Sequence, residues 1–337
     1  VTTAHNFTIS ENTRAEYLMV AGGGGTGNAG SGAGAGGMQQ GFIDLSANVE
    51  YKIRVGDGGT KSYNYDNITW MNYETNQSVT GVVSSNNKSD DPNYYNGMKG
   101  KDSYIKLASN DASINDVSGI EMKAYGGGAG FNQGPSYVNW VHGTDAMKNL
   151  IQASHDGGSS GGGNRYMHDP GELLGTNQGH QGGSGAGWSG SQKRYHGGGG
   201  GAGGAGVGRP DPINSHQGSG IAAGGIGKAS SITGTSIIYA QGGEGSESST
   251  NVKGGGQTVN GQSDGVNGTG GGGAGHKDNG GNGGSGVVIL RILRTASSGT
   301  STTDYNIINV GGDETTGNGF SFETYVKPSV KSTIDYL

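Results

Sequence analysis

Alternation of hydrophobic and polar residues marks the first clear strands of this chain. Val49, Tyr51, Ile53 and Val55 share one face of an extended segment, and the residues between them are charged. This two-residue period is typical of a half-buried strand. The apolar segment 15–20 predicts a second strand, because it stops abruptly against a run of glycine.

The same kind of pattern continues along the chain. Further strands are expected at SYIKLA (103–108), GIEMKA (119–124), TSIIYA (235–240) and GSGVVILRILR (284–294). One helix is expected over 144–156, because Thr144 can cap it and the apolar residues that follow are spaced for one helical face. Residues 60–100 are rich in Tyr, Asn and Ser, which predicts mostly turns and loop.

Glycine changes this picture. The chain has 337 residues, and 76 of them are Gly, about three times the usual ~7%. Hydrophobic residues make up only 30% and charged residues 14%, and the net charge is -6. Disordered chains usually combine low hydrophobicity with high net charge. Here the net charge is small for the length, so charge repulsion does not explain the composition.

A glycine run has three interpretations: a flexible linker, a phosphate-binding loop, or a packed structure that only glycine can form. Gly22, Gly24 and Gly27 match the dinucleotide pattern G-x-G-x-x-G, and Asp44 follows at about the right distance. That motif must open a helix, however, and the glycine-rich segment after it is a poor helix former. We therefore expect no nucleotide cofactor and no other cofactor.

The packed interpretation rests on backbone geometry. Helices of the polyproline-II type have three residues per turn and no internal hydrogen bonds, so their N–H and C=O groups point sideways. Without Cβ atoms such helices can approach closely and bond to one another. We predict this for residues 197–208, with the strands at 15–20, 49–55 and 286–292 holding the ends. The expected fold is mainly β: a small β-sandwich clamping a bundle of polyglycine-II helices, with at most one or two short α-helices.

The order of segments also carries a family resemblance. The succession of YLMVAGGGG, VEYKIRVGDGG, AYGGGAG and GGSGVVILRI resembles the glycine-rich domain of structural proteins from tailed phages and large viruses. The resemblance covers about residues 5–293. It implies a β-sandwich that carries polyglycine-II helices, placed on a tail fibre or adhesin. The loops between the helices would then meet the host surface.

The C-terminal part has a different pattern. After a Ser/Thr linker at 296–303, the segment NGFSFETYVKPS is similar to the first strands of laminin-G or concanavalin-like lectin domains. We therefore expect a glycine-rich domain at 1–295, including the 60–100 excursion, and the start of a second, truncated β domain at 304–337. The chain is expected to be part of a longer protein.

The remaining chemistry excludes several function classes. The chain has no cysteine, so it has neither disulfides nor thiolate metal sites. Its eight histidines show no helical i, i+4 pair, and we expect no metal site and no enzymatic activity. The scattered Lys and Arg form no basic patch for nucleic acid. No apolar stretch is long enough to span a membrane.

Aromatic and charged residues between the glycine runs are the remaining candidates for function. Such side chains on rigid loops suit contact with a sugar or protein surface, or they cover the ends of the bundle. The receptor-contact candidates are Phe131, Tyr137, Trp188, Arg194, Tyr195 and His196. We expect a virion component of the tail-fibre or adhesin type, located on the virion surface or outside the cell. Its expected partners are a host glycan or protein and further virion subunits, including copies of itself. The alternative is a subunit of a secreted microbial fibre.

Overall fold

The fold is seen in a computed structural model of the chain. It describes residues 4–27, 30–61, 68–72, 77–81, 97–108, 120–131, 153–164, 169–186, 195–208, 220–246, 249–276, 280–294, 304–311 and 321–325. This part of the chain is built from strands in antiparallel sheets and from glycine-rich runs without regular secondary structure.

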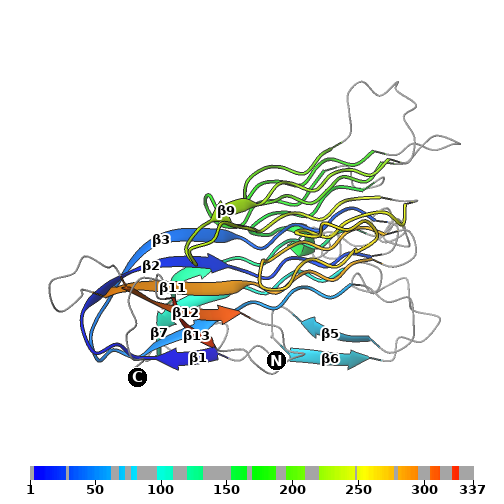
Figure 1. The fold of residues 1–337 in the computed structure, drawn as a ribbon. Helices are drawn as coiled ribbons and strands as arrows, with labels where there is room; N and C mark the ends of the chain where they lie inside the picture. The colour runs from blue at the N-terminus through cyan, green and yellow to red at the C-terminus, as the bar shows by residue number, and fades with distance from the viewer. Residues whose placement is uncertain are drawn as a thin grey trace, which may run out of the picture.

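Two antiparallel sheets form the first part of the fold (Figure 1). The five-stranded sheet has the order β13-β12-β11-β2-β3, with β2 (Thr13–Val20), β3 (Met38–Leu45), β11 (Val287–Arg294), β12 (Asp304–Gly311) and β13 (Ser321–Tyr325). The four-stranded sheet has the order β1-β4-β7-β8, with β1 (Ala4–Phe7), β4 (Tyr51–Arg54), β7 (Ser103–Leu107) and β8 (Ile120–Ala124). The expected mainly β fold is confirmed.

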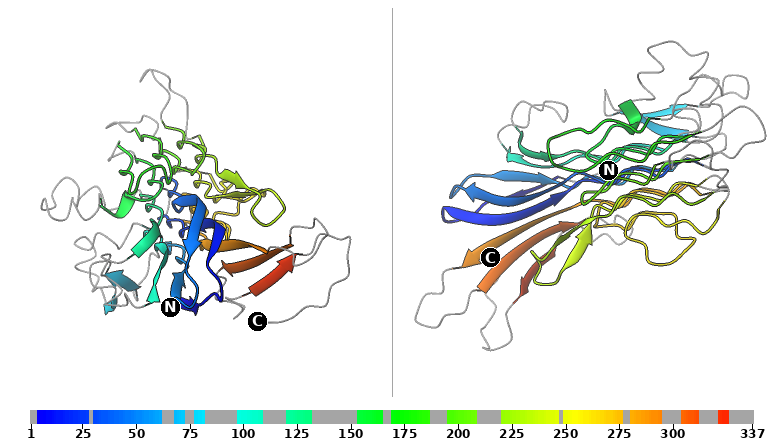
Figure 2. Two further views of the ribbon diagram at one scale, coloured as in Figure 1. Left: turned by 90° about the vertical axis from the view of Figure 1, so that its left-hand side faces the viewer. Right: turned by 90° about the horizontal axis from the view of Figure 1, so that it is seen from above.

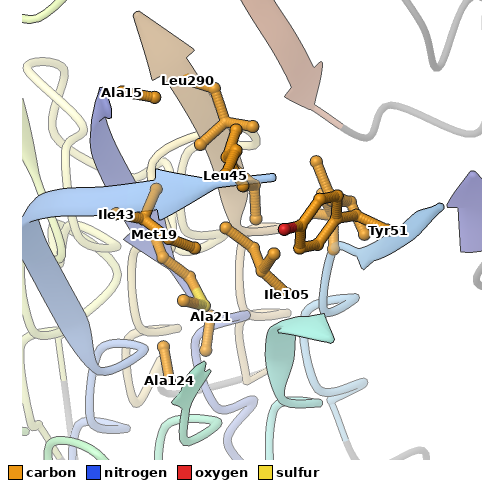
Figure 3. Packing of buried hydrophobic residues seen from close by; sticks show 12 residues of the cluster. Ala15, Met19, Ala21, Ile43, Leu45, Tyr51, Ile105, Ala124 and Leu290 are labelled. Atoms are coloured by element: carbon orange, nitrogen blue, oxygen red, sulfur yellow. The ribbon is translucent and has the colours of Figure 1, made fainter. Parts of the chain in front are cut away.

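A hydrophobic core joins the two sheets. Met19 of β2 and Leu290 of β11 pack with Ile53 of β4 and Ile105 of β7, and all four are at most 1% exposed. Figure 3 shows Met19, Ile105 and Leu290 meeting between the sheets, with Tyr51 beside them. The alternation at 49–55 therefore places its apolar face in this core, as the sequence indicates.

The opposite face of β2 and β11 is also buried. Leu18, Val20 and Ile289 pack there against Ile232 and Tyr239. The last two belong to a hairpin of β9 (Lys228–Ser230) and β10 (Ile237–Tyr239) and its turn. Because both of their faces are covered, the sequences of β2 and β11 are nearly continuously apolar and do not alternate between apolar and polar residues.

The glycine runs cross-bond with a three-residue period. Successive N–H groups of residues 21–26 donate to three different neighbouring runs and then repeat the cycle. Their acceptors, in chain order, are the carbonyls of Gly37, Lys101, Gly284, Gly34, Met98 and Gly281, at 2.8–3.0 Å. A strand would bond on alternate sides, whereas a polyproline-II-type helix turns by one third per residue.

The carbonyls of residues 22–25 accept hydrogen bonds from three further runs. Those of Gly22 and Gly25 accept from the run 127–130, that of Gly23 accepts from Gly59, and that of Gly24 accepts from Gly273. Residues 21–26 therefore lie among six runs. Residues 30–37 are also bonded to six runs, which include 125–131, 159–162, 197–200 and 243–246. We call this hexagonal arrangement the glycine array.

The array continues directly from the sandwich. Residues 21–27 follow β2, 55–61 follow β4 and 125–131 follow β8, while 30–37 lead into β3 and 280–286 lead into β11. The strands at 15–20, 49–55 and 286–292 thus hold the ends of the central runs, as predicted. Figure 2, left, looks along the strands and runs and shows the array extending beyond the two sheets.

The prediction that residues 197–208 pack against other glycine runs is confirmed in part. Residues 197–201 bond mainly to other runs, for example Gly199 to Gly243 and Gly200 to Ser160. The chain then turns at 202–204 and runs back, so that Gly198 donates to Val207 within the same segment. The segment 197–208 therefore crosses the array twice, in opposite directions.

The structure also describes parts of the 60–100 excursion, of the expected helix and of the C-terminal segment. The 60–100 excursion, expected to be mostly turns and loop, contains a hairpin of β5 (Ile68–Asn72) and β6 (Gln77–Gly81). Of the predicted helix, residues 153–155 are helical, and 144–152 lie outside the described residues. β12 pairs with β11 over eight residues, so the segment after the linker extends the first sheet. The boundary at 296–303 stays a prediction.

Candidate functional site

The array has one end at the sandwich and a free end opposite to it. Residues 21–27 run outward from β2, and 30–37 return antiparallel to them. Residues 197–200 lie parallel to 32–35, so His196 is at the free end and Gly200 is nearer the sandwich. Ala186 and Tyr195, the residues on either side of the connection 187–194 that holds two of the candidates, therefore both lie at the free end.

Ala186 and Tyr195, the residues on either side of that connection, form a short antiparallel backbone bridge. The N–H of Ala186 donates to the carbonyl of Tyr195 at 3.0 Å, and the N–H of Tyr195 donates back at 2.8 Å. Tyr195 is half-buried, and this burial raises the pKa of its hydroxyl. Trp188 and Arg194 lie outside the described residues, but the chain ends that carry them are fixed to each other.

Phe131 and His196 do not lie on the surface. Phe131 is fully buried and stacks on the ring of His155, and its N–H bonds to the hydroxyl of Ser31 at 2.8 Å. His196 is 2% exposed. Both expected contact residues are therefore buried in the array in this structure and cannot face a receptor. Tyr137, like Trp188, lies outside the described residues.

His155, which was not among the candidate residues, lies in the interior of the array. Its ring is fully buried, and its Nδ1 lies 2.6 Å from the carbonyl of Ala129. Desolvation lowers the pKa of His155 from 6.5 to about 3, because burial penalises the charged form more than the carbonyl favours it. His155 is therefore a neutral ring that donates to the backbone and covers Phe131.

The segment that matches the phosphate-loop pattern, Gly22 to Gly27, is one of the runs of the glycine array. The N–H groups of residues 22–25, which a phosphate would need, all donate to carbonyls of neighbouring runs. A Cβ at Gly22 would overlap the carbonyl of Asp57, so no space for a ligand is left beside this backbone. In the described part of the chain, no group of three or more His, Asp or Glu side chains could hold a metal ion.

Comparison with known proteins identifies the family. The sequence matches the family described as "Glycine-rich domain" over residues 1–293, and the chain belongs to this family. No curated protein and no solved structure matches the chain. Among the helices that the structure describes, none is long and apolar enough to cross a membrane.

Proposed function

We propose that this protein is a non-enzymatic structural component of a virion, of the tail-fibre or adhesin type, that attaches to a host surface. The observation that supports this proposal is the shape of the array. Runs fixed by lateral backbone bonds begin at the sandwich, and Ala186 and Tyr195, which flank the connection 187–194, are paired at the opposite end. The array interior has almost no side chains, so recognition must come from connections between runs.

The composition of the connections fits a contact role. Trp188, Gln192, Lys193 and Arg194 lie within seven residues and combine a stacking surface with amide and charged donors. The paired Ala186 and Tyr195 hold both ends of this segment, which lowers the entropy lost on binding. A subunit of a secreted fibre would share the rigid array but would have no need for these side chains at its free end.

Attachment should be lost when Trp188 and Arg194 are both changed to Ala. The physical reason is that these side chains supply the stacking surface and the charged donor, whereas the array that carries them is unchanged. The measurement is binding of fluorescently labelled protein to a panel of bacterial and protist cells. We expect at least a tenfold loss on the cells that bind the unchanged protein, or about 1.4 kcal/mol, and an unaltered melting temperature.

Phe42→Ala is the matched control. Phe42 is 60% exposed on β3, in the sandwich, and its ring lies beneath the guanidinium of Arg14. This variant also removes an exposed aromatic side chain but should bind cells normally. Absence of binding to every cell type, or equal binding by the Trp188→Ala, Arg194→Ala double variant, would refute the proposed function.

A further inference from the structure

Asparagine is followed by glycine at three places in the described part of the chain: Asn260–Gly261, Asn267–Gly268 and Asn282–Gly283. In such a pair the backbone nitrogen of the glycine can attack the side-chain amide of the asparagine, because no Cβ on the glycine hinders the approach. The three pairs share this local chemistry and differ in their hydrogen bonds. The fold can therefore single out one of them.

Asn267 and Gly268 are both held by one residue, Ser285. The N–H of Ser285 donates to Asn267 Oδ1 at 3.0 Å. The N–H of Gly268 donates to Ser285 Oγ, also at 3.0 Å. A third bond, from the N–H of Gly270 to the carbonyl of Ser285 at 2.8 Å, fixes the rest of the turn. The oxygen and the nitrogen that take part in the attack thus face the same serine.

Each of the first two bonds assists the attack. As the nitrogen adds to Asn267 Cγ, negative charge develops on Oδ1, and an N–H group that already points at this oxygen stabilises it. The nitrogen must also lose its proton, and a serine hydroxyl can accept a proton while donating its own. Ser285 is only 8% exposed, so packing fixes both of its groups. Asn267 is exposed, and Gly268 has open space where a Cβ would stand, so water can reach the pair.

The other two pairs have a carbonyl in place of the hydroxyl. The N–H of Gly261 donates to the carbonyl of Val252 at 3.1 Å, and that of Gly283 donates to the carbonyl of Gly59 at 2.8 Å. A carbonyl accepts a hydrogen bond but has no proton to pass on. Asn282 Oδ1 does accept a backbone N–H, at 2.9 Å, so this pair has only half of the arrangement.

We propose that Asn267 is a self-modification site, at which Ser285 promotes conversion of the asparagine to aspartate and isoaspartate. The Gly268 nitrogen forms a bond to Asn267 Cγ, the bond from Cγ to the amide nitrogen breaks, and ammonia leaves with the proton that Gly268 gave up. Water then opens the cyclic imide. Cleavage of the new bond gives aspartate. Cleavage of the original peptide bond gives isoaspartate, in which the main chain passes through the former side chain.

The modified turn lies where the array meets the sandwich. The carbonyl of Thr269 accepts from Ala240, and the carbonyl of Gly270 accepts from Gly36, just before β3. Conversion adds a negative charge at this place, and isoaspartate also lengthens the main chain of the turn by a methylene group. The site is remote from the free end of the array, so the inference does not depend on the proposed function.

The test is peptide mapping of the whole chain by mass spectrometry after incubation in mildly alkaline buffer, which gives the converted fraction at each pair. In the folded chain we expect Asn267 to convert at least about tenfold faster than Asn260, although both are exposed. In concentrated urea the two rates should become similar, because both pairs are then the same Asn–Gly sequence in an unfolded chain.

Ser285→Ala separates assistance by the hydroxyl from simple mobility of the turn. The variant keeps the N–H that holds Asn267, and it should slow conversion there roughly tenfold while leaving Asn260 unchanged. Ser249→Ala is the matched control and should leave both rates unchanged, since Ser249 Oγ also accepts a backbone N–H at 3.0 Å, from Asn251.

Two results would overturn the proposal. The first is conversion of Asn267 no faster than that of Asn260 in the folded, unchanged protein. The second is an equal or higher rate at Asn267 in Ser285→Ala, because a loosened turn would then account for the reaction. The first comparison needs no variant, so it decides the question even where Ser285→Ala fails to fold.

Discussion

Replacing Gly199 by Ala should lower the free energy of unfolding by about 3 kcal/mol, the upper end of the cost of over-packing. Gly199 is buried among neighbouring runs, and an added Cβ would overlap the carbonyl group of Ala33. A clashing side chain can rotate away, but here the obstacle is backbone that itself bonds to Gly273 and Gly243. The runs must move apart, and several hydrogen bonds weaken together.

Chemical denaturation measures this effect as a shift of the midpoint at constant slope. The matched control is Ala205→Val, which adds two methyl groups at an exposed position of the same segment. It should stay within about 0.5 kcal/mol of the unchanged protein. Equal midpoints for Gly199→Ala and the unchanged chain would show that the runs are not in backbone contact.

Acid should destabilise the protein through His155 by up to about 5 kcal/mol between pH 6.5 and 3. Burial lowers the pKa of His155 in the folded chain to about 3, while the unfolded chain keeps the ordinary value of 6.5. Between these values the unfolded state binds the proton and the folded state does not. The contribution is therefore complete above pH 6.5 and is lost progressively as the pH falls towards 3.

The free energy of unfolding is measured against pH for the unchanged protein and for His155→Gln. The variant should be less stable at pH 7, since it loses the packing against Phe131, but its stability should fall less steeply in acid. Carboxylates contribute equally in both proteins, so the difference between the two curves isolates His155. His180→Gln, at an exposed histidine, should follow the unchanged protein. Parallel curves for the unchanged protein and His155→Gln would refute the assignment.

The sequence predicts the framework well, because strands and runs have clear local signals. The alternation at 49–55 and the apolar segments at 15–20 and 287–292 each correspond to a strand. Absence of Cβ atoms is itself a local property, so the close packing of glycine runs could be argued from composition. The partners of each run could not, since they depend on which runs lie nearby in space.

The candidate site was harder to predict, because burial in the array is a non-local property. Phe131 and His196 resemble exposed linker residues in the sequence, since each flanks a glycine run. In the structure each occupies a buried position at a run end. The role of His155 depends on Phe131 and on the carbonyl of Ala129, which lie over 20 residues away in the chain. Nothing in the sequence near His155 indicates these neighbours.

The central claim is that three successive residues of a glycine run bond to three different neighbours. NMR scalar couplings across hydrogen bonds test it directly, by identifying the carbonyl that accepts from each amide. We predict couplings from the amides of Gly23, Gly24 and Gly25 to the carbonyls of Gly284, Gly34 and Met98. Couplings from Gly23 and Gly25 to one shared neighbouring segment, as in a β-strand, would contradict the account, as would rapid exchange of all three amides with solvent.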